Sequence, residues 1–316
     1  MPKSDTSESI AWLSDDGCAL EGFYRGLNIF RYVYRPDTPA VESPKPYFHP
    51  LRSLSGATLT GFRPEDHPWH HGLSMTLTLV DDHNFWGGPT YRREDGYLDR
   101  SNHGRQNHVG WLLKTHDRYG IRLKQALDWQ TVAGDTLLSE QRLIEFDFSQ
   151  SDSDGYVLSF DINLQNVSGK SLSLDTYASA SGLAGSPYTG LQFRGCRGFM
   201  RPKKELGYRV FADGRYLEVP DVHGRRWPWI AACGRCTADH EATLIFCDDP
   251  GNPRYPNVFF IREDSDQVAF SFVGDQTLKL QAGESIRLRY RLAIVSRSLS
   301  EAEIYERAGL LLATSD

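Results

Sequence analysis

The sequence predicts an all-β protein, built as a large antiparallel β sandwich with long loops and a short C-terminal helix. Three stretches, 73–80, 156–164 and 285–294, alternate apolar and polar residues, which is typical of strands with one buried face. Turn-forming sequences such as GDQ, DGR and AGE separate several apolar runs. Helix signals are scarce. The length of 316 residues fits one large sandwich, so we expect a single domain over residues 1–316.

The expected elements follow one another along the chain with no repeat and no linker. Residues 1–20 precede the first apolar run, and we expect them to be poorly ordered. The predicted strands cover residues 23–34, 73–80, 119–127, 136–148, 156–164, 171–177, 242–247, 257–261, 267–273 and 285–294. A helix is predicted over 300–312, because Ser300 suits an N-cap and Glu303 follows it by three positions. Residues 87–110 are polar and rich in Gly, Arg and His, which predicts a long functional loop.

Composition excludes several classes of function. The net charge of −6 is spread along the chain without a basic block, so nucleic acid is not an expected partner. No apolar run reaches the roughly eighteen residues that would span a membrane, and the N-terminal segment lacks the apolar core of a signal peptide. Five cysteines are present, and Cys233 and Cys236 lack a second ligand pair for zinc. These features predict a cytoplasmic protein.

Seven of the ten histidines lie between His49 and His108, and this density predicts a site. We expect five of them to converge on one pocket, with the 87–110 loop closing over it: His49, His67, His70, His71 and His108. Asp66 and Pro68 suit the start of a helical turn, on which His67 and His71 would face the same way. Three interpretations compete: metal ligands, metal-free acid/base and substrate-binding residues, or capping and packing residues. Because no HExxH motif and no carboxylate in ligand spacing accompanies the cluster, we favour the metal-free interpretation and expect no cofactor.

Glu140 and Arg142 form a second candidate. In the strand over 136–148 they alternate onto the same face as Ile144 and Phe146, which predicts that both charged side chains point inward. Charged residues are rarely buried unless they are paired. One alternative is therefore an ion pair, or a strand that begins in solvent. The other is that both residues line a cavity near the histidines, with Glu140 as a base or as a partner to substrate hydroxyls.

Aromatic and polar residues form a third group. Trp86 lies in NFWGG, Tyr188 and Arg194 lie in SPYTGLQFRG, and two further tryptophans lie in RRWPWIA. Aromatic faces near His and Arg suit stacking on a sugar ring, and core packing is the alternative for the tryptophans. The sequence contains no nucleophile elbow, no P-loop and no GxGxxG after a strand. Serine-triad hydrolysis, ATP chemistry and Rossmann-type NAD binding are therefore unsupported.

Six motifs in this order resemble the PmoA-related family of bacterial proteins: PYFHPL, DHPWHHGL, NFWGG, GRQNH, YTGLQFRG and DDPGNPRYPNVFFIRE. The resemblance runs from about residue 20 to residue 308, and DHPWHHG stands where the family has approximately D-H-P-H-H-R-G. It implies a β sandwich similar to the sugar mutarotase supersandwich, in proteins that accompany carbohydrate catabolism. The matching positions imply these site residues: His49, His67, His70, His71, Trp86, His108, Tyr188, Arg194, Asn252 and Arg262.

Together these observations predict a carbohydrate-active enzyme, an isomerase or lyase that performs epimerisation, mutarotation or β-elimination on a sugar or oxidised sugar. Such reactions need a base and an acid flanking one carbon. We expect His70 or His71 as the acid/base, Glu140 as its partner, Arg142 in substrate binding, and Arg194 or Arg262 on a carbonyl or carboxylate. A non-catalytic sugar-binding or sensing protein and a His-ligated metal-dependent lyase or oxygenase remain as alternatives. A small carbohydrate is the expected partner, and a homo-oligomer is compatible with the sequence.

Overall fold

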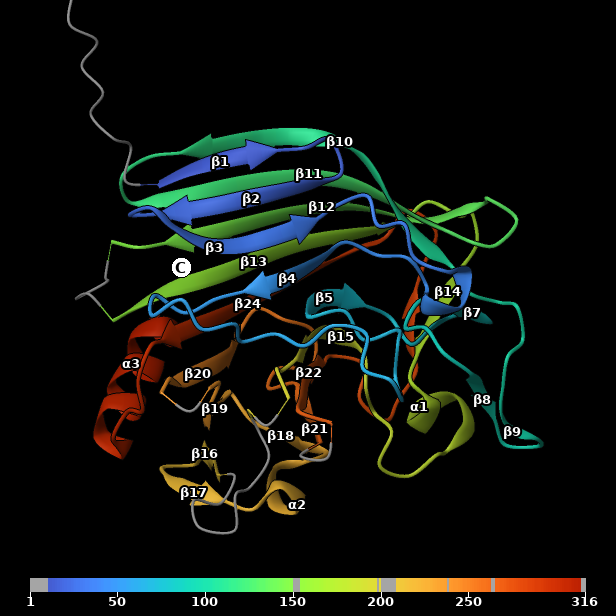
Figure 1. Ribbon diagram of the computed structural model, residues 1–316. Coiled ribbons are helices and arrows are strands. Elements are labelled where there is room, and N and C mark those ends of the chain that lie inside the picture. Colours follow the sequence, from blue (N-terminus) through green and yellow to red (C-terminus); the bar gives the residue numbers. More distant parts are fainter. Residues whose placement is uncertain are drawn as a thin grey trace, which may run out of the picture.

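Two large antiparallel sheets pack face to face in the computed structural model, which describes residues 11–149, 154–197, 199, 209–237, 239–262 and 265–313 (Figure 1). The first sheet contains, in spatial order, β1 (Ala11–Asp15), β2 (Ala19–Tyr24), β3 (Leu27–Val33), β4 (Tyr47–Leu51), β5 (Leu73–Thr76), β15 (Gly190–Arg194), β22 (Gln267–Ser271), β21 (Val258–Arg262) and β18 (Arg225–Arg226). The second contains β10 (Arg105–His116), β11 (Gly120–Gln130), β12 (Thr136–Asp147), β13 (Gly155–Asn166), β24 (Ser285–Val295), β20 (Glu241–Asp248), β19 (Trp229–Arg235), β16 (Arg209–Ala212) and β17 (Arg215–Leu217). The predicted all-β sandwich is confirmed.

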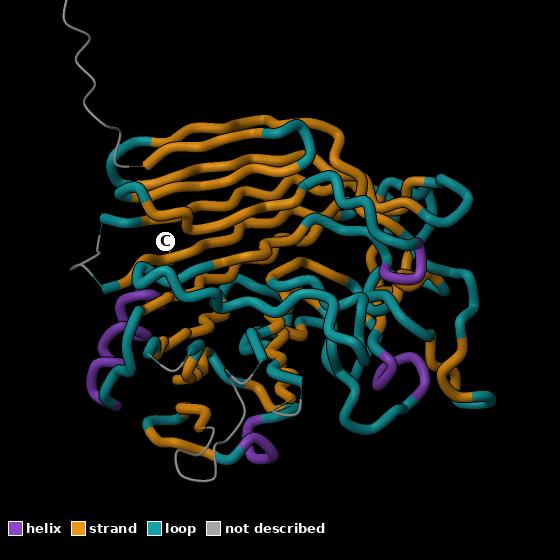
Figure 2. The backbone as a smooth tube through the Cα atoms, viewed as in Figure 1, coloured by secondary structure: helices purple, strands orange, loops and turns teal. Residues whose placement is uncertain are grey.

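Smaller elements lie around the sandwich, and strands dominate the backbone (Figure 2). One small sheet contains β23 (Leu278–Leu280), β14 (Leu172–Asp175), β6 (Leu79–Val80) and β7 (His83–Asn84), and another pairs β8 (Thr90–Arg92) with β9 (Gly96–Leu98). The helices are η1 (Ala40–Glu42), α1 (Tyr177–Ser181), α2 (Val219–Val222) and α3 (Glu301–Ala313). Within the described ranges, none of these helices is long and apolar enough to cross a membrane.

The core forms where the alternating strands turn their apolar faces toward one another. On β13, Tyr156, Leu158, Phe160, Ile162 and Leu164 are all buried, as the period of two predicts. They belong to one continuous apolar cluster to which both large sheets contribute. Burial of this shared face is what holds the two layers together.

Most predicted strands are found, and the helix over 300–312 is found as α3, capped by reciprocal hydrogen bonds between Ser300 and Glu303. The stretch 73–80, predicted as one strand with one face in water, is instead divided between β5 and β6 of two different sheets and is buried throughout. The predicted strand over 171–177 ends at Asp175, and α1 begins at Tyr177.

Two expectations about irregular segments were incomplete. Residues 11–20, expected to be poorly ordered, contain β1 and the start of β2, whereas residues 1–10 lie outside the described residues. The 87–110 segment is not one loop. Gly96 at φ 74° makes the turn of the β8–β9 hairpin, and β10 already begins at Arg105.

Candidate active site

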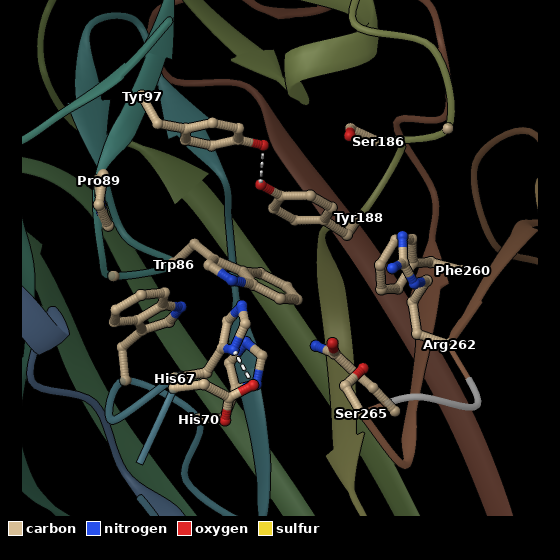
Figure 3. A pocket seen from close by; sticks show the side chains of 15 residues that line it. His67, His70, Trp86, Pro89, Tyr97, Ser186, Tyr188, Phe260, Arg262 and Ser265 are labelled. Carbon is tan, nitrogen blue, oxygen red and sulfur yellow. Dashed lines mark hydrogen bonds and ion pairs between the residues drawn. The ribbon is translucent and has the colours of Figure 1, made fainter. Parts of the chain in front are cut away.

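A cavity of about 470 Å³ opens beside β15 and β21, within the range of roughly 300–1,000 Å³ that is common for small-molecule sites. Figure 3 shows the rings of Trp86, Tyr97 and Tyr188 on one side, His67 and His70 beneath them, and Phe260, Arg262 and Ser265 on the other side. The lining residues are Asp66, His67, Trp69, His70, Trp86, Gly87, Pro89, Tyr97, Gly185, Ser186, Tyr188, Phe260, Arg262, Ser265 and Gln267.

Four residues make an aromatic wall: Trp86, Tyr97, Tyr188 and Phe260. The ring centroids of Trp86 and Tyr188 lie 4.6 Å apart, and those of Tyr188 and Phe260 lie 5.1 Å apart. Tyr97, from the β8–β9 hairpin, brings its hydroxyl to 3.2 Å from that of Tyr188. From the predicted polar segment, Gly87, Pro89 and Tyr97 line the cavity. A wall of this kind offers flat apolar faces for stacking and hydroxyls at its upper end.

The chain segment 61–72 presents the histidines, and it is pinned to β15 by backbone hydrogen bonds. Gly61 donates to the carbonyl of Arg194, and Arg194 donates to that of Gly72. Between these points the chain makes two consecutive turns, His67 to the carbonyl of Pro64 and His70 to that of His67. The predicted helical turn, with His67 and His71 on one side, is therefore not formed. Instead, the rings of His67 and His70 stack with centroids 5.0 Å apart and an interplanar angle of 22°.

His67 is paired with a carboxylate. Its Nδ1 lies 2.9 Å from Oδ2 of Asp66, and this contact lowers the pKa of Asp66. The ring N–H is not aligned for a regular hydrogen bond to the carboxylate. The adjacent negative charge still favours the tautomer with its hydrogen on Nδ1, which leaves the lone pair of the neutral ring on Nε2. Among the described residues, Nε2 of His67 has no hydrogen-bond partner, so it can accept a proton from a ligand in the cavity.

His70 has the opposite arrangement. Arg194 Nη1 lies 3.0 Å from Nδ1 of His70, and a guanidinium can only donate. Nδ1 must therefore accept, and Nε2 carries the hydrogen. Burial, followed by the charge of Arg194, lowers the pKa of His70 well below its ordinary value. His70 is thus a neutral, oriented hydrogen-bond donor, which leaves it the acid side of the predicted acid/base role.

Two side chains that sequence reasoning missed, Lys45 and Asn84, make hydrogen bonds to the backbone of the turn that carries Trp86. Lys45 is buried, and its Nζ donates to the carbonyls of Glu42 (2.8 Å), Ser43 (3.1 Å) and Trp86 (2.9 Å). Burial lowers the pKa of Lys45 to about 7, whereas three carbonyl acceptors favour the ammonium form, since a neutral amine has only two hydrogens to donate. Asn84 Oδ1 accepts from the backbone of Trp86 and Gly87. In the sequence, the only signal of this anchoring role is a single lysine in PKPYF.

Gly88 gives a test of how tightly this turn packs. Its φ is 70°, and an added Cβ would lie 2.4 Å from the Trp69 ring. Gly96 has a similar φ of 74°, and a Cβ added there would meet no atom within 4 Å. Gly96→Ala therefore measures only the free-energy cost of placing alanine in this backbone conformation. We expect Gly88→Ala to lower the free energy of unfolding by about 1–3 kcal/mol more than Gly96→Ala, in denaturant titrations. Equal losses in the two variants would show that Trp69 is not packed against this glycine.

The cavity lies in a part of the chain that matches a known protein family. A model of the family of unknown function DUF6807 matches residues 21–308. The chain belongs to this family. No curated protein matches the chain. All residues lining the cavity, from Asp66 to Gln267, fall within the DUF6807 match. The resemblance to the PmoA-related family stays a prediction.

The structure brings about half of the predicted site residues to the cavity. Five line it directly, namely His67, His70, Trp86, Tyr188 and Arg262, and Arg194 reaches it through His70. The other six predicted residues, His49, His71, His108, Glu140, Arg142 and Asn252, are not in its lining. The histidine cluster of this DUF6807 chain is therefore divided, and the predicted single pocket for five histidines is not formed. Asp66, Tyr97 and Phe260 line the cavity without having been singled out as site residues.

His71 and His49 lie behind the histidine segment. His71 Nε2 is 2.8 Å from Glu42 Oε2 and 3.1 Å from the carbonyl of Pro68, so this nitrogen donates. Burial, followed by the charge of Lys45, lowers the pKa of His71 to about 2, and its Nδ1 has no partner. His49 bonds to Thr60 and stacks on Phe62. We assign both histidines to anchoring the segment.

Glu140 and Arg142 form a buried ion pair, as one of the two alternatives predicted. Their exposed fractions are 2% and 1%, and Arg142 Nε lies 2.6 Å from Glu140 Oε1. Trp129 Nε1 donates to the same carboxylate at 2.7 Å. Although burial disfavours its charge, the carboxylate of Glu140 raises the pKa of Arg142. The pair lies between the sheets, where Arg142 also donates to the hydroxyl of Tyr32 on β3 of the first sheet, and neither residue lines the cavity.

His108 and Asn252 also belong to hydrogen-bonded structure elsewhere. His108 Nδ1 bonds to Gln125, whose Oε1 accepts from the hydroxyl of Tyr32, which in turn accepts from Arg142. The polar network around the ion pair thus extends to this histidine. Asn252 donates to Asp248 and to the carbonyl of Arg289, both at 2.7 Å, and so fixes the turn after β20.

Within the ranges that the structure describes, no three His, Cys, Asp or Glu side chains are grouped so that they could hold a metal ion. We therefore expect dialysis against EDTA to leave ligand binding and turnover unchanged. Elemental analysis of protein purified without nickel would check this. About one equivalent of metal, lost on chelation together with activity, would contradict the expectation and favour the metal-dependent alternative.

Proposed function

We propose that this chain is an enzyme that binds a sugar or oxidised sugar in the cavity and moves a proton on it by metal-independent acid/base chemistry. One observation carries the proposal: His67 and His70 stack 5.0 Å apart in the lining of one cavity, with opposite hydrogen-bonding roles. The Asp66 carboxylate leaves His67 as a proton acceptor, and the Arg194 guanidinium leaves His70 as a donor. An acceptor beside a donor is the minimum that proton transfer on one carbon centre requires.

The rest of the cavity supports a carbohydrate ligand. The aromatic wall offers faces on which the C–H side of a sugar ring can stack. Arg262, Ser265 and Gln267 lie in the same lining and supply polar groups for hydroxyl, carbonyl or carboxylate oxygens. A ligand held between these two sides would present one edge to the histidines.

In this arrangement His67 would take a proton through Nε2, and its imidazolium would be stabilised by Asp66 across 2.9 Å. His70 would hold an oxygen of the ligand through its Nε2 hydrogen. Delivery of a proton from water to the opposite face of the carbon, with release of the His67 proton to water, gives epimerisation. Loss of a neighbouring substituent gives β-elimination. Proton transfer between ring oxygen and anomeric hydroxyl gives mutarotation.

We also propose the cytoplasm as the compartment, which is supported by five cysteines that are all free in the structure. The predicted homo-oligomer stays a prediction. A non-catalytic sugar-binding protein would use the same aromatic wall, and it is the second candidate.

A panel of monosaccharides, keto sugars and sugar acids tests the proposal. Binding can be followed by tryptophan fluorescence, because Trp69 and Trp86 line the cavity, and turnover by proton NMR. We expect at least one compound both to bind and to be converted. Binding without conversion across the panel would favour the sugar-binding protein, and absence of both would overturn the carbohydrate assignment.

A further inference from the structure

We infer that the substrate is a carbonyl sugar, a ketone or aldehyde with hydrogen on the adjacent carbon, and that it reacts through an enolate whose oxygen is held by His70. Arg194 is the positioning residue for this step. The inference rests on the proposed function and narrows it from acid/base chemistry in general to proton abstraction beside a carbonyl.

The first argument is the fixed role of His70. The hydrogen bond from Arg194 to Nδ1 leaves only a donor, Nε2–H, for the cavity. A donor that cannot become an acceptor matches an oxygen that only accepts, which is the case for a carbonyl oxygen and more so for an enolate oxygen. Since the donor is buried and oriented before the ligand arrives, little reorganisation accompanies charge development on that oxygen.

The second argument is the sign of the charge around His70. After burial, the charge of Arg194 is the largest influence that lowers the pKa of His70, and the charge of Lys45 acts in the same direction. Both cations disfavour positive charge on the ring, and the same field favours negative charge on an oxygen in front of it. The carboxylates nearby are already engaged, Asp66 with His67 and Glu42 with Arg63 and His71. The histidine side of the cavity is therefore suited to an oxyanion.

The third argument is the spacing of the two rings. Stacked imidazoles with centroids 5.0 Å apart can each address one of two neighbouring atoms of a small ligand. His67 Nε2 takes the proton from the carbon next to the carbonyl. The C–H electron pair forms a carbon–carbon double bond, and the carbonyl π pair moves onto oxygen, which accepts the hydrogen bond from His70. The oxygen pair then re-forms the carbonyl, and the carbon–carbon π pair either takes a proton from water on the opposite face, while His67 releases its proton to water, or expels a β-substituent, which leaves with its electron pair. No oxidant, reductant or co-reactant is needed.

The deciding experiment runs the reaction in D₂O with whichever panel compound is converted. We expect deuterium on the carbon next to the carbonyl, or a primary isotope effect when that carbon is deuterated beforehand. Conversion with neither signature, as in mutarotation, would overturn the inference while leaving the proposed function in place. Failure of every panel compound to bind or react would instead overturn the proposed function and the inference together.

The role of Arg194 has its own readout, the ¹⁵N shifts of the His70 ring, which identify the protonated nitrogen. We expect Nε2–H across neutral pH in the wild type, and a mixture of tautomers in Arg194→Gln. We also expect glycolate to bind more tightly than the isosteric, uncharged glycolamide, and Arg194→Gln to lose that preference. An Nδ1–H tautomer in the wild type, or equal affinity for the two probes, would contradict the assignment. Both wild-type measurements decide the question even if Arg194→Gln does not fold.

Discussion

His67→Gln should lower kcat roughly 100- to 10,000-fold, the range that general acid/base residues contribute. The glutamine amide keeps a polar side chain of similar length but has no lone pair basic enough to take a proton from carbon. His67 is partly exposed at the cavity and makes its ion-pair contact with the neighbouring Asp66, so the fold should survive the change. Ligand affinity, measured by tryptophan fluorescence, should change far less than kcat, because the aromatic wall is untouched.

His116→Gln is the matched control, since His116 is an exposed histidine near the end of β10 and does not line the cavity. It should leave kcat and affinity as in the wild type. Asp66→Asn should lower kcat less than His67→Gln, because the imidazole remains but its orientation and its charged form lose support. If His67→Gln retained full turnover, His67 would not be the base.

Arg142→Met should lower the free energy of unfolding by about 3–5 kcal/mol, the cost of leaving one partner of a buried ion pair uncompensated. The Glu140 carboxylate would keep its hydrogen bond from Trp129 but lose both contacts with the guanidinium, in the interior between the sheets. Denaturant titration of the variant at pH 7 measures the effect.

An exposed ion pair that joins β11 to β12 serves as the control. Arg122 on β11 lies 2.6 Å from Glu145 on β12, but their side chains are 58% and 37% exposed. Arg122→Met should therefore cost less than about 1 kcal/mol. The double variant Glu140→Gln/Arg142→Met should recover part of the stability lost by Arg142→Met alone. Similar losses for Arg122→Met and Arg142→Met would mean that burial does not determine the energetics of the pair.

The alternation of apolar and polar residues predicted most of the sandwich, because a strand that buries one face must repeat with a period of two. The same rule correctly placed Glu140 and Arg142 inside. It could not tell that their side chains lie outside the lining of the cavity, since the order of strands in a sheet depends on pairings between segments far apart in sequence. β10 escaped prediction because its burial alternates poorly along much of its length and two bulges shift its register.

The sequence predicted where the candidate site lies, but not the chemical role of each of its residues. Density of histidine located the 61–72 segment, but density does not say which imidazoles share a cavity. His71 turns toward Glu42 because consecutive turns, and not a helical turn, carry the chain past Pro68. The donor role of His70 depends on Arg194, which lies more than a hundred positions away in sequence. The adjacency of Asp66 and His67 is the one local signal of a carboxylate-paired histidine, and the same aspartate also suits a helix cap.

A structure of the protein with a converted panel sugar, or with a stable analogue of it, tests the central claim most directly. The account predicts the ligand against Trp86 and Tyr188, with one oxygen within hydrogen-bond distance of His70 Nε2 and the reacting carbon facing His67 Nε2. A ligand bound elsewhere on the chain, or in this cavity with both histidine nitrogens turned away from it, would contradict the account.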